Sequence, residues 1–295
     1  MPRLTQAPRS VALLVIGGVY VVAVAAAVAA VAALPPGTSL AWQLGAASLA
    51  GTVATFACSV ALDNSSAFDP YWSVAPMVTV PWLLALAQAP GPRAWLAALL
   101  VEAWGARLTY NWVRQWRGMG HEDFRYVDQR RTAGRAYWVV SFLGIHLFPA
   151  VLVWLGSLAL LPAMLSRAPL GPVDALGVAV TLGGTLVEAT ADRQLSDFVR
   201  SPHEPGAICT RGLWAWSRHP NYLGEMLFWW GLALLALGAE PGVWRHLGGA
   251  LAISALFNLV SIPLMERRMA KRRPLFRAHQ RRVSRVLPWP PRGAA

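Results

Sequence analysis

Long apolar runs separated by short polar stretches dominate the chain. Most of these runs have about 17 to 25 residues, the length with which an α-helix crosses a bilayer. The eight runs are 11–34, 41–62, 76–90, 94–112, 137–164, 173–191, 222–238 and 243–264. The two shortest, 76–90 and 222–238, also fit a tilted helix, a half-inserted helix or part of a helical hairpin. The pattern predicts an all-α, polytopic membrane bundle of seven or eight transmembrane helices.

The composition supports a membrane location. Of the 295 residues, 56% are hydrophobic and only 14% are charged, and the mean hydropathy is +0.43. These values lie far from those of soluble domains. The run 11–34 is longer than the apolar part of a signal peptide, so we interpret it as a retained first span. We expect one integral membrane domain over residues 1–295, with residues 1–40 forming an extra N-terminal span.

Positive charge is concentrated in alternate loops. All but one of the 26 basic residues are arginines, and the formal net charge is +12. With an even number of spans, one side of the membrane receives Arg3, Arg9, the loops 113–136 and 192–220, and the tail from Arg267. The other side receives Arg93, Arg167 and Arg245. The positive-inside rule makes the basic side cytoplasmic and places both termini there. This distribution argues against a nucleic-acid partner.

A first polar cluster is DNSSAFDPYWS, residues 63–73. It includes Asp69 and Tyr71, which we take as candidate catalytic residues. The dipeptide Asp69-Pro70 also fits a helix cap followed by a first-turn proline.

A second cluster starts in the run 94–112. On a helix, Trp104, Arg107 and Asn111 share one face because they are three and four residues apart. Snorkelling to the headgroups is an alternative explanation for Arg107. The sequence His121-Glu122-Asp123 has no second histidine at helical spacing, so we expect no metal site.

A third cluster runs from Glu188 to Glu225. Pro220 breaks any incoming helix and marks the start of a new one, whose unpaired N–H groups suit an anionic ligand. Asn221 and Glu225 lie one turn apart on that helix, so the carboxylate is expected to fix the amide or a ligand carboxamide. Pairing of Glu225 with an arginine is the structural alternative.

Together the clusters describe a pocket at one membrane face. Arginines at one end suit phosphates, and the apolar interior suits a lipophilic substrate. The chain has neither a P-loop nor a G-x-G-x-x-G sequence, so a nucleotide would be held by helix ends and side chains.

Several segments resemble a known family. RGLWAWSRHPNYLGE, DPYWSVAP, HEDFRY and LMERRMAKRRPLFRAHQRRVSRVLP are similar to bacterial steroid 5α-reductase-like membrane proteins, which are related to the 3-oxo-5α-steroid 4-dehydrogenases. The resemblance covers roughly residues 41–290. The Arg-His-Pro-x-Tyr-x-Gly turn also occurs in isoprenylcysteine carboxyl methyltransferases and in sterol reductases.

The resemblance implies an NADPH-dependent membrane reductase that passes hydride to the β-carbon of an enone, in a bacterial inner membrane. Asn221 to Glu225 match the family's Asn-aromatic-Leu-Gly-Glu element, and Arg107 matches the arginine of its Tyr-x-x-Arg element. Trp104 replaces that element's tyrosine, so Asp69 and Tyr71 would take over the contact with the substrate carbonyl. The candidate cofactor-binding residues are Arg107, Asn111, Glu188, Asp192, Arg200, Arg211, Arg218, His219, Asn221, Tyr222, Glu225 and Arg268.

Three functions compete at this point. The reductase needs a proton donor, which is Tyr71 oriented by Asp69 or a protonated Asp69. The alternative enzyme is an S-adenosylmethionine-dependent methyltransferase, but the arginine excess suits the phosphates of NADPH better than a cationic sulfonium. A lipid-binding protein without catalysis is the third. The expected partners are a steroid-like or other lipophilic enone and membrane lipid.

Overall fold

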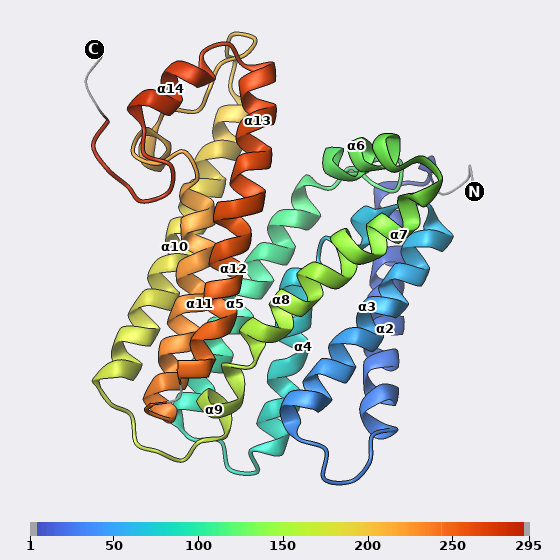
Figure 1. Cartoon of the computed structure of the whole chain (residues 1–295), viewed down its shortest axis with the longest axis vertical. Helices are drawn as coiled ribbons and strands as arrows, with labels where there is room; N and C mark the ends of the chain where they lie inside the picture. The colour runs from blue at the N-terminus through green and yellow to red at the C-terminus, as the bar shows by residue number, and fades with distance from the viewer. Residues whose placement is uncertain (1–4, 243, 292–295) are drawn as a thin grey trace. The chain divides into compact units, whose positions relative to one another are not determined.

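The computed structural model describes residues 5–242 and 244–291, and its regular elements in these ranges are helices (Figure 1). The all-α prediction is therefore confirmed. The chain divides into two compact units, Met1–Ser166 and Arg167–Ala295. Arg3 and residue 243, which the sequence-based topology used, lie outside the described residues.

Unit 1 contains most of the short helices. Its elements are α2 (Arg9–Ala32), α3 (Leu40–Leu62), η1 (Ser65–Phe68), α4 (Tyr71–Leu86), α5 (Pro92–Gln115), α6 (Phe124–Ala133), η2 (Gly134–Ala136), α7 (Tyr137–Ser141), η3 (Phe142–Leu147), α8 (Phe148–Ser157) and α9 (Leu160–Leu165). Helices α2 and α3 form a hairpin, and α4 packs against both α5 and α8. The polar loop between α3 and α4 follows the end of this hairpin.

The expected span 137–164 is realised as successive pieces rather than one regular helix. A π-helical turn, Phe142–Leu147, joins α7 to α8. Pro149 lies in the first turn of α8, where it has no N–H to donate to the preceding turn. A wider turn before it accommodates the missing hydrogen bond.

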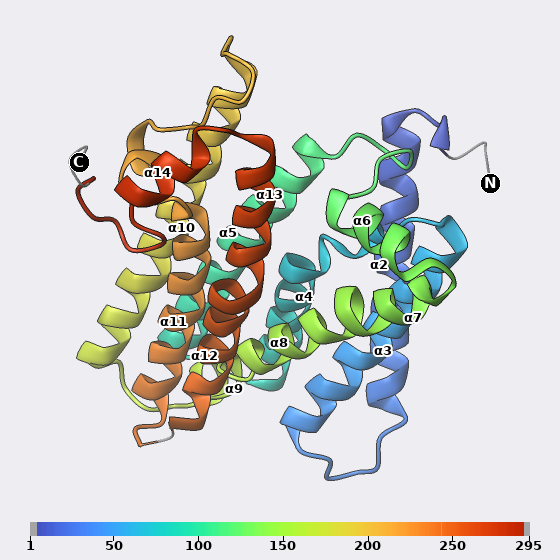
Figure 2. The ribbon, with the colours of Figure 1, turned by 45° about the horizontal axis from the view of Figure 1, so that its top comes forward.

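Unit 2 is built on long helices that run side by side (Figures 1 and 2). Its elements are α10 (Pro172–Arg200), η4 (Gly212–Ala215), α11 (Pro220–Ala239), η5 (Trp244–His246), α12 (Leu247–Leu256), η6 (Phe257–Ser261), α13 (Ile262–Arg272) and α14 (Phe276–Arg282). Helix α11 lies between α10 and α12 and is the most buried of them.

A seam of glycines joins α10 to α11. Gly177 and Gly184 on α10 meet Gly231 and Gly224 on α11, and the two glycines on each helix are seven residues apart. Gly238, a further seven residues along α11, packs against the Asp174 side chain. A Cβ atom on Gly184 would lie 2.7 Å from the carbonyl oxygen of Gly224, so the two backbones touch without intervening side chains. Seven-residue spacing keeps one face of each helix on its neighbour, and small residues are what membrane helices use for close approach. The seam fixes α11, which carries several candidate residues.

The described residues contain six helical stretches that are long and apolar enough to cross a membrane. They are Arg9–Ala32, Leu40–Leu62, Phe124–Leu165, Pro172–Arg200, Pro220–Ala239 and Trp244–Arg272. Helices α4 and α5 occupy the other two expected ranges. Helix α4 has only 16 residues, and α5 carries four charged side chains. The chain is an integral membrane protein whose outer surface contacts lipid.

Candidate functional site

In unit 1, two sequence motifs bind each other across the loops. We call residues 63–73 the Asp-Pro loop and residues 121–126 the Glu-Asp loop. The Asn64 side chain donates from Nδ2 to the carbonyl of Met119 at 2.9 Å and to that of His121 at 3.1 Å. The first motif is therefore anchored to the second by a buried amide.

Glu122 is the ionic centre of this contact. Its Oε1 accepts a hydrogen bond from the backbone N–H of Ser65 at 2.8 Å and another from the Tyr137 hydroxyl at 3.3 Å. Arg130 reaches Glu122 Oε1 at 3.2 Å and Asp63 Oδ1 at 2.8 Å. A carboxylate that accepts several hydrogen bonds holds its loop in one conformation. The network thus positions the start of α4.

Asp69 lies between the two motifs. Its Oδ1 accepts a hydrogen bond of 2.6 Å from the Tyr126 hydroxyl. Burial raises the pKa of the Asp69 carboxyl to about 6, although the Tyr126 hydrogen bond and the charge of Arg125 oppose this rise. Burial dominates because it penalises the charged form.

Tyr71 begins α4, and its hydroxyl contacts Ser48 on α3. It donates to the Ser48 carbonyl at 2.9 Å and lies 3.0 Å from Ser48 Oγ. Its ring stacks on Phe68, with a centroid separation of 4.6 Å. We expected Asp69 to orient Tyr71; instead, Ser48 holds the Tyr71 hydroxyl and Tyr126 bonds to Asp69.

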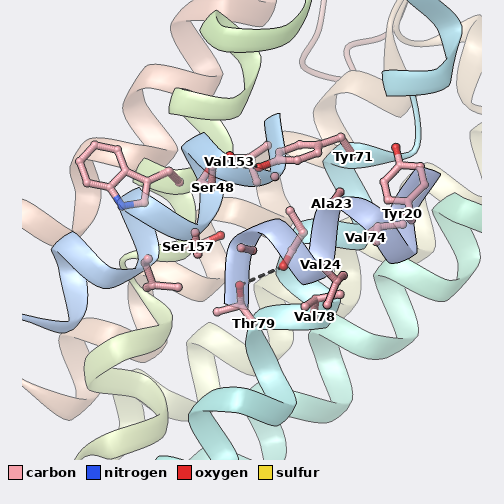
Figure 3. A pocket seen from close by; sticks show the side chains of 16 residues that line it. Tyr20, Ala23, Val24, Ser48, Tyr71, Val74, Val78, Thr79, Val153 and Ser157 are labelled. Carbon is pink, nitrogen blue, oxygen red and sulfur yellow. Dashed lines mark hydrogen bonds between the residues drawn. The ribbon is translucent and has the colours of Figure 1, made fainter. Parts of the chain in front are cut away.

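The Tyr71 hydroxyl faces an apolar cavity (Figure 3). The cavity lies among α2, α3, α4 and α8 and has about 600 Å³ of empty volume, including its open mouth. Its polar lining side chains are those of Tyr20, Ser48, Tyr71, Thr79, Trp154 and Ser157. The Tyr20 hydroxyl donates to the carbonyl of Ala67 at 3.2 Å, so it also supports the Asp-Pro loop.

Helix α5 carries the two remaining candidates of unit 1. Trp104 is fully buried, and Arg107 and Asn111 are partly buried. The Asn111 Oδ1 accepts a hydrogen bond from Gln115 Nε2 at 2.9 Å, one turn further along. Helix α5 packs against α4, which begins at Tyr71.

In unit 2, Arg218 is bound on several sides. Its Nε donates to Glu266 Oε1 at 2.7 Å, and the two side chains are only 10% and 14% exposed. Its Nη1 donates to the carbonyls of Gln280 at 2.8 Å and Val283 at 2.6 Å. Arg218 therefore ties the start of α11 to α13 and α14.

Glu266 also binds the next residue of the motif. His219 Nε2 lies 3.2 Å from Glu266 Oε1, and Gln280 donates to Glu266 Oε2 at 2.9 Å. The His219 ring stacks on Tyr222 at 5.5 Å with an interplanar angle of 7°. One carboxylate thus fixes the two charged or titratable side chains that precede Pro220.

The chain beyond α14 folds back over the start of α11. We call residues 283–289 the strap. The backbone N–H of Arg218 donates to the Ser284 carbonyl at 2.9 Å, and Ser217 Oγ donates to the Val286 carbonyl at 2.6 Å. The strap supplies carbonyl acceptors to the residues that precede α11. These residues have donor groups that the hydrogen bonds of the helix itself cannot satisfy.

Glu188, Asn221 and Glu225 come from α10 and α11. Glu188 packs against Gly224 across the glycine seam, and Glu225 is buried one turn beyond Asn221. The Glu225 carboxylate accepts a hydrogen bond from Trp229 Nε1 at 2.9 Å. From the sequence we expected Glu225 to contact Asn221, a ligand carboxamide or an arginine. The structure shows Trp229 as a hydrogen-bond donor to Glu225.

The other cofactor candidates of unit 2 lie toward the surface. Arg200 ends α10 and is exposed, as is Arg211 before η4, whereas Asp192 and Arg268 are partly buried. The candidates therefore form one set in unit 1 and another in unit 2.

The family match covers most of the residues that carry these motifs. A family described as "Protein of unknown function (DUF1295)" matches residues 55–283. The chain belongs to this family. An "Uncharacterized protein C594.04c" of Schizosaccharomyces pombe is 27% identical, with 78% of this chain and 74% of the relative covered. No solved structure matches.

The matched region contains Glu122 and Glu266, the carboxylates of the two hydrogen-bond networks, but it does not contain every residue of the candidate sites. Asp69, Glu122 and Glu266 lie inside residues 55–283, whereas Ser48 and most of the strap lie outside. The cavity is thus completed by α2 and most of α3, which precede the family match.

Sequence reasoning missed several residues of these networks. The pairs Asp69–Tyr126 and Arg218–Glu266 are 57 and 48 residues apart, and no periodicity relates such positions. One signal was present for Glu266, which is the acidic residue at the head of a strongly basic segment.

Proposed function

We propose that the protein is an NADPH-dependent membrane reductase that transfers hydride to the enone C=C bond of a steroid-like or other lipophilic substrate. The observation that carries the proposal is the Tyr71 hydroxyl, which faces an apolar cavity and is held from behind by Ser48. An apolar cavity with few polar groups is the usual form of a site for a lipophilic ligand.

Tyr71 is the proposed proton donor. A substrate carbonyl oxygen at the polar end of the cavity would accept the hydrogen bond that Tyr71 now gives to the Ser48 carbonyl. Ser48 Oγ, at 3.0 Å, would then donate to the Tyr71 oxygen and stabilise the negative charge that develops there.

Asp69 is less suited to donate a proton. With a pKa of about 6, only about a tenth of this carboxyl is protonated at pH 7. Its hydrogen bond from Tyr126 fits a positioning role, because it couples the Glu-Asp loop to the first turn of α4.

NADPH would supply the hydride. Phosphates of this cofactor would suit Arg107 in unit 1 and Arg200, Arg211 and Arg268 in unit 2, because a guanidinium pairs with phosphate oxygens. Arg218 donates hydrogen bonds from Nε to Glu266 and from Nη1 to two carbonyls. In this proposal it therefore positions the start of α11. His219, held by Glu266, stands at the start of α11 beside Asn221 and Tyr222.

The proposed orientation puts the basic loops and both termini in the cytoplasm, where NADPH is made. It rests on the arginine distribution. A single cysteine introduced at position 125, in a variant lacking Cys58 and Cys209, should react with a membrane-impermeant reagent only after the cells are opened. Labelling of intact cells would contradict the orientation.

A ligand titration tests the function. The purified full chain in detergent should gain thermal stability with NADPH, by about 2.7 kcal/mol at a hundredfold excess over the dissociation constant, and should oxidise NADPH when a 4-en-3-one steroid is added. Stabilisation by S-adenosylmethionine instead would identify the methyltransferase alternative. No response to either would leave the lipid-binding protein.

Two matched phenylalanine variants sharpen the test. Tyr71→Phe should lower turnover by about 100-fold or more with NADPH binding retained, because it removes the proton donor. Tyr20→Phe removes a hydroxyl from the same cavity and should keep most of the turnover. Equal turnover in both variants would exclude Tyr71 as the donor.

A further inference from the structure

The segment 267–285 holds nine of the chain's 26 basic residues and no acidic residue. The cations are Arg267, Arg268, Lys271, Arg272, Arg273, Arg277, Arg281, Arg282 and Arg285. Seven of them are exposed: Arg267, Lys271, Arg272, Arg277, Arg281, Arg282 and Arg285. We call this set the basic surface. The segment begins in the last turns of the apolar helical stretch Trp244–Arg272 and continues beyond its end.

Glu266, the acidic residue that directly precedes this segment, binds other groups. Glu266 directs Oε1 to Arg218 and His219 and Oε2 to Gln280, all toward the body of unit 2. The charge of Glu266 is paired with Arg218 at the start of α11. Because residues 267–285 include nine basic and no acidic residues, the segment carries a strongly positive field.

The basic surface sits on a folded scaffold. Phe276 and Val283 are buried at either end of α14, and Arg218 donates to the carbonyls of Gln280 and Val283. A scaffold that is ordered before binding loses less conformational entropy when it meets a partner than a flexible tail does.

Apolar groups accompany the charges. Leu275, Leu287 and Trp289 are 66%, 68% and 69% exposed. A groove with about 1020 Å³ of empty volume, including its open mouth, lies between the loop 207–215 and α14. Its charged lining residue is Arg282, since burial and the nearby Arg218 and Arg282 lower the pKa of His279 and favour its neutral form.

We propose that the basic surface binds anionic phospholipid, with the headgroup phosphate at the exposed arginines and the apolar part of the lipid against the groove. Basic clusters next to a membrane span are attracted to anionic headgroups, and a tryptophan suits the headgroup level. The chain is already anchored in the bilayer, so the lipid is present at high effective concentration. This anchoring favours lipid over a soluble polyanion such as nucleic acid.

The experiment uses the full chain in a neutral detergent, titrated with short-chain phosphatidylglycerol. Backbone amide hydrogen exchange of residues 273–289 reports binding at this segment. We expect protection by phosphatidylglycerol and little protection by phosphatidylcholine of the same chain length. Arg272→Gln, Arg277→Gln and Arg281→Gln combined should weaken the apparent affinity by about 100-fold, since each charge contributes about fivefold.

Two control variants separate charge from folding. The same three positions changed to lysine should keep most of the affinity, because headgroup attraction needs charge more than arginine geometry. Glutamine at Arg117, Arg131 and Arg135, which are exposed in unit 1, removes the same charge elsewhere and should leave the protection of 273–289 unchanged.

Three outcomes would overturn the proposal. One is equal affinity for phosphatidylglycerol in the glutamine triple variant and the wild type, with amide exchange in α10 and α11 unchanged. Another is equal protection by phosphatidylcholine. The third is full protection by glycerol phosphate without acyl chains, which would mark a site for a free phosphate.

Discussion

The two units hold their candidate residues in different ways. Unit 1 uses side chains: Glu122, Asp69 and their partners connect two loops that are far apart in sequence. Unit 2 adds backbone contacts to its Arg218–Glu266 ion pair: glycines bring α10 and α11 into contact, and the strap bonds to the residues before α11. Both units should therefore be sensitive to lost polar groups, and unit 2 also to atoms added in the glycine seam.

The largest expected effect is an added methyl group in the glycine seam. Gly184→Ala would place Cβ 2.7 Å from the Gly224 carbonyl oxygen, which forces the helices apart and should cost about 3 kcal/mol. Gly183→Ala meets nothing within 4 Å and should be neutral or gain up to about 1 kcal/mol from helix propensity. Denaturation in mixed micelles measures both. Equal free energies of unfolding would refute the seam's role.

The next effect comes from the carboxylate of unit 2. Glu266→Ala leaves Arg218 and His219 without their shared acceptor and should cost about 2 to 3 kcal/mol, somewhat less than for a fully buried ion pair. Glu266→Gln keeps one acceptor and should lose less. Thermal unfolding of the two variants side by side checks the order, and the reverse order would argue against an ionic role.

A pH effect isolates Asp69 in unit 1. Its pKa is about 6 in the folded chain against 3.8 as the ordinary value. Between pH 4 and 6 the unfolded chain releases this proton while the folded chain keeps it, so stability falls as the pH rises through this window. The loss is on the order of 2 kcal/mol. Asp69→Asn should match the wild type at pH 4 and exceed it at pH 8; a constant difference would show that Asp69 does not titrate in this range.

The smallest effect is that of one hydroxyl. Tyr126→Phe removes the hydrogen bond to Asp69 and should cost about 1 to 2 kcal/mol at pH 8, where the carboxylate is charged. At pH 4 the loss should be smaller. The substitution should also raise the pKa of Asp69 further, so the window of the preceding titration should move to higher pH; an unmoved window would contradict the contact.

The sequence predicted the helices better than their contacts. The expected runs 41–62 and 222–238 agree closely with α3 and α11, because apolar length is a local property. The hydrogen bond between Tyr71 and Ser48 and the ion pair between Arg218 and Glu266 could not be predicted, since the packing of other helices brings these partners together. The catalytic and cofactor assignments stay predictions.

The strap has a consequence for biosynthesis. Ser217 pairs with Ser284 and Val286, which are translated 67 and 69 residues later. At about 5 to 20 residues per second, the ribosome needs roughly 3 to 14 s to reach them after Ser217. During that interval α11 enters the membrane with its first turn unfinished. The start of α11 therefore gains its partners only when the strap emerges, and a chaperone or protease would have those seconds in which to act on the chain.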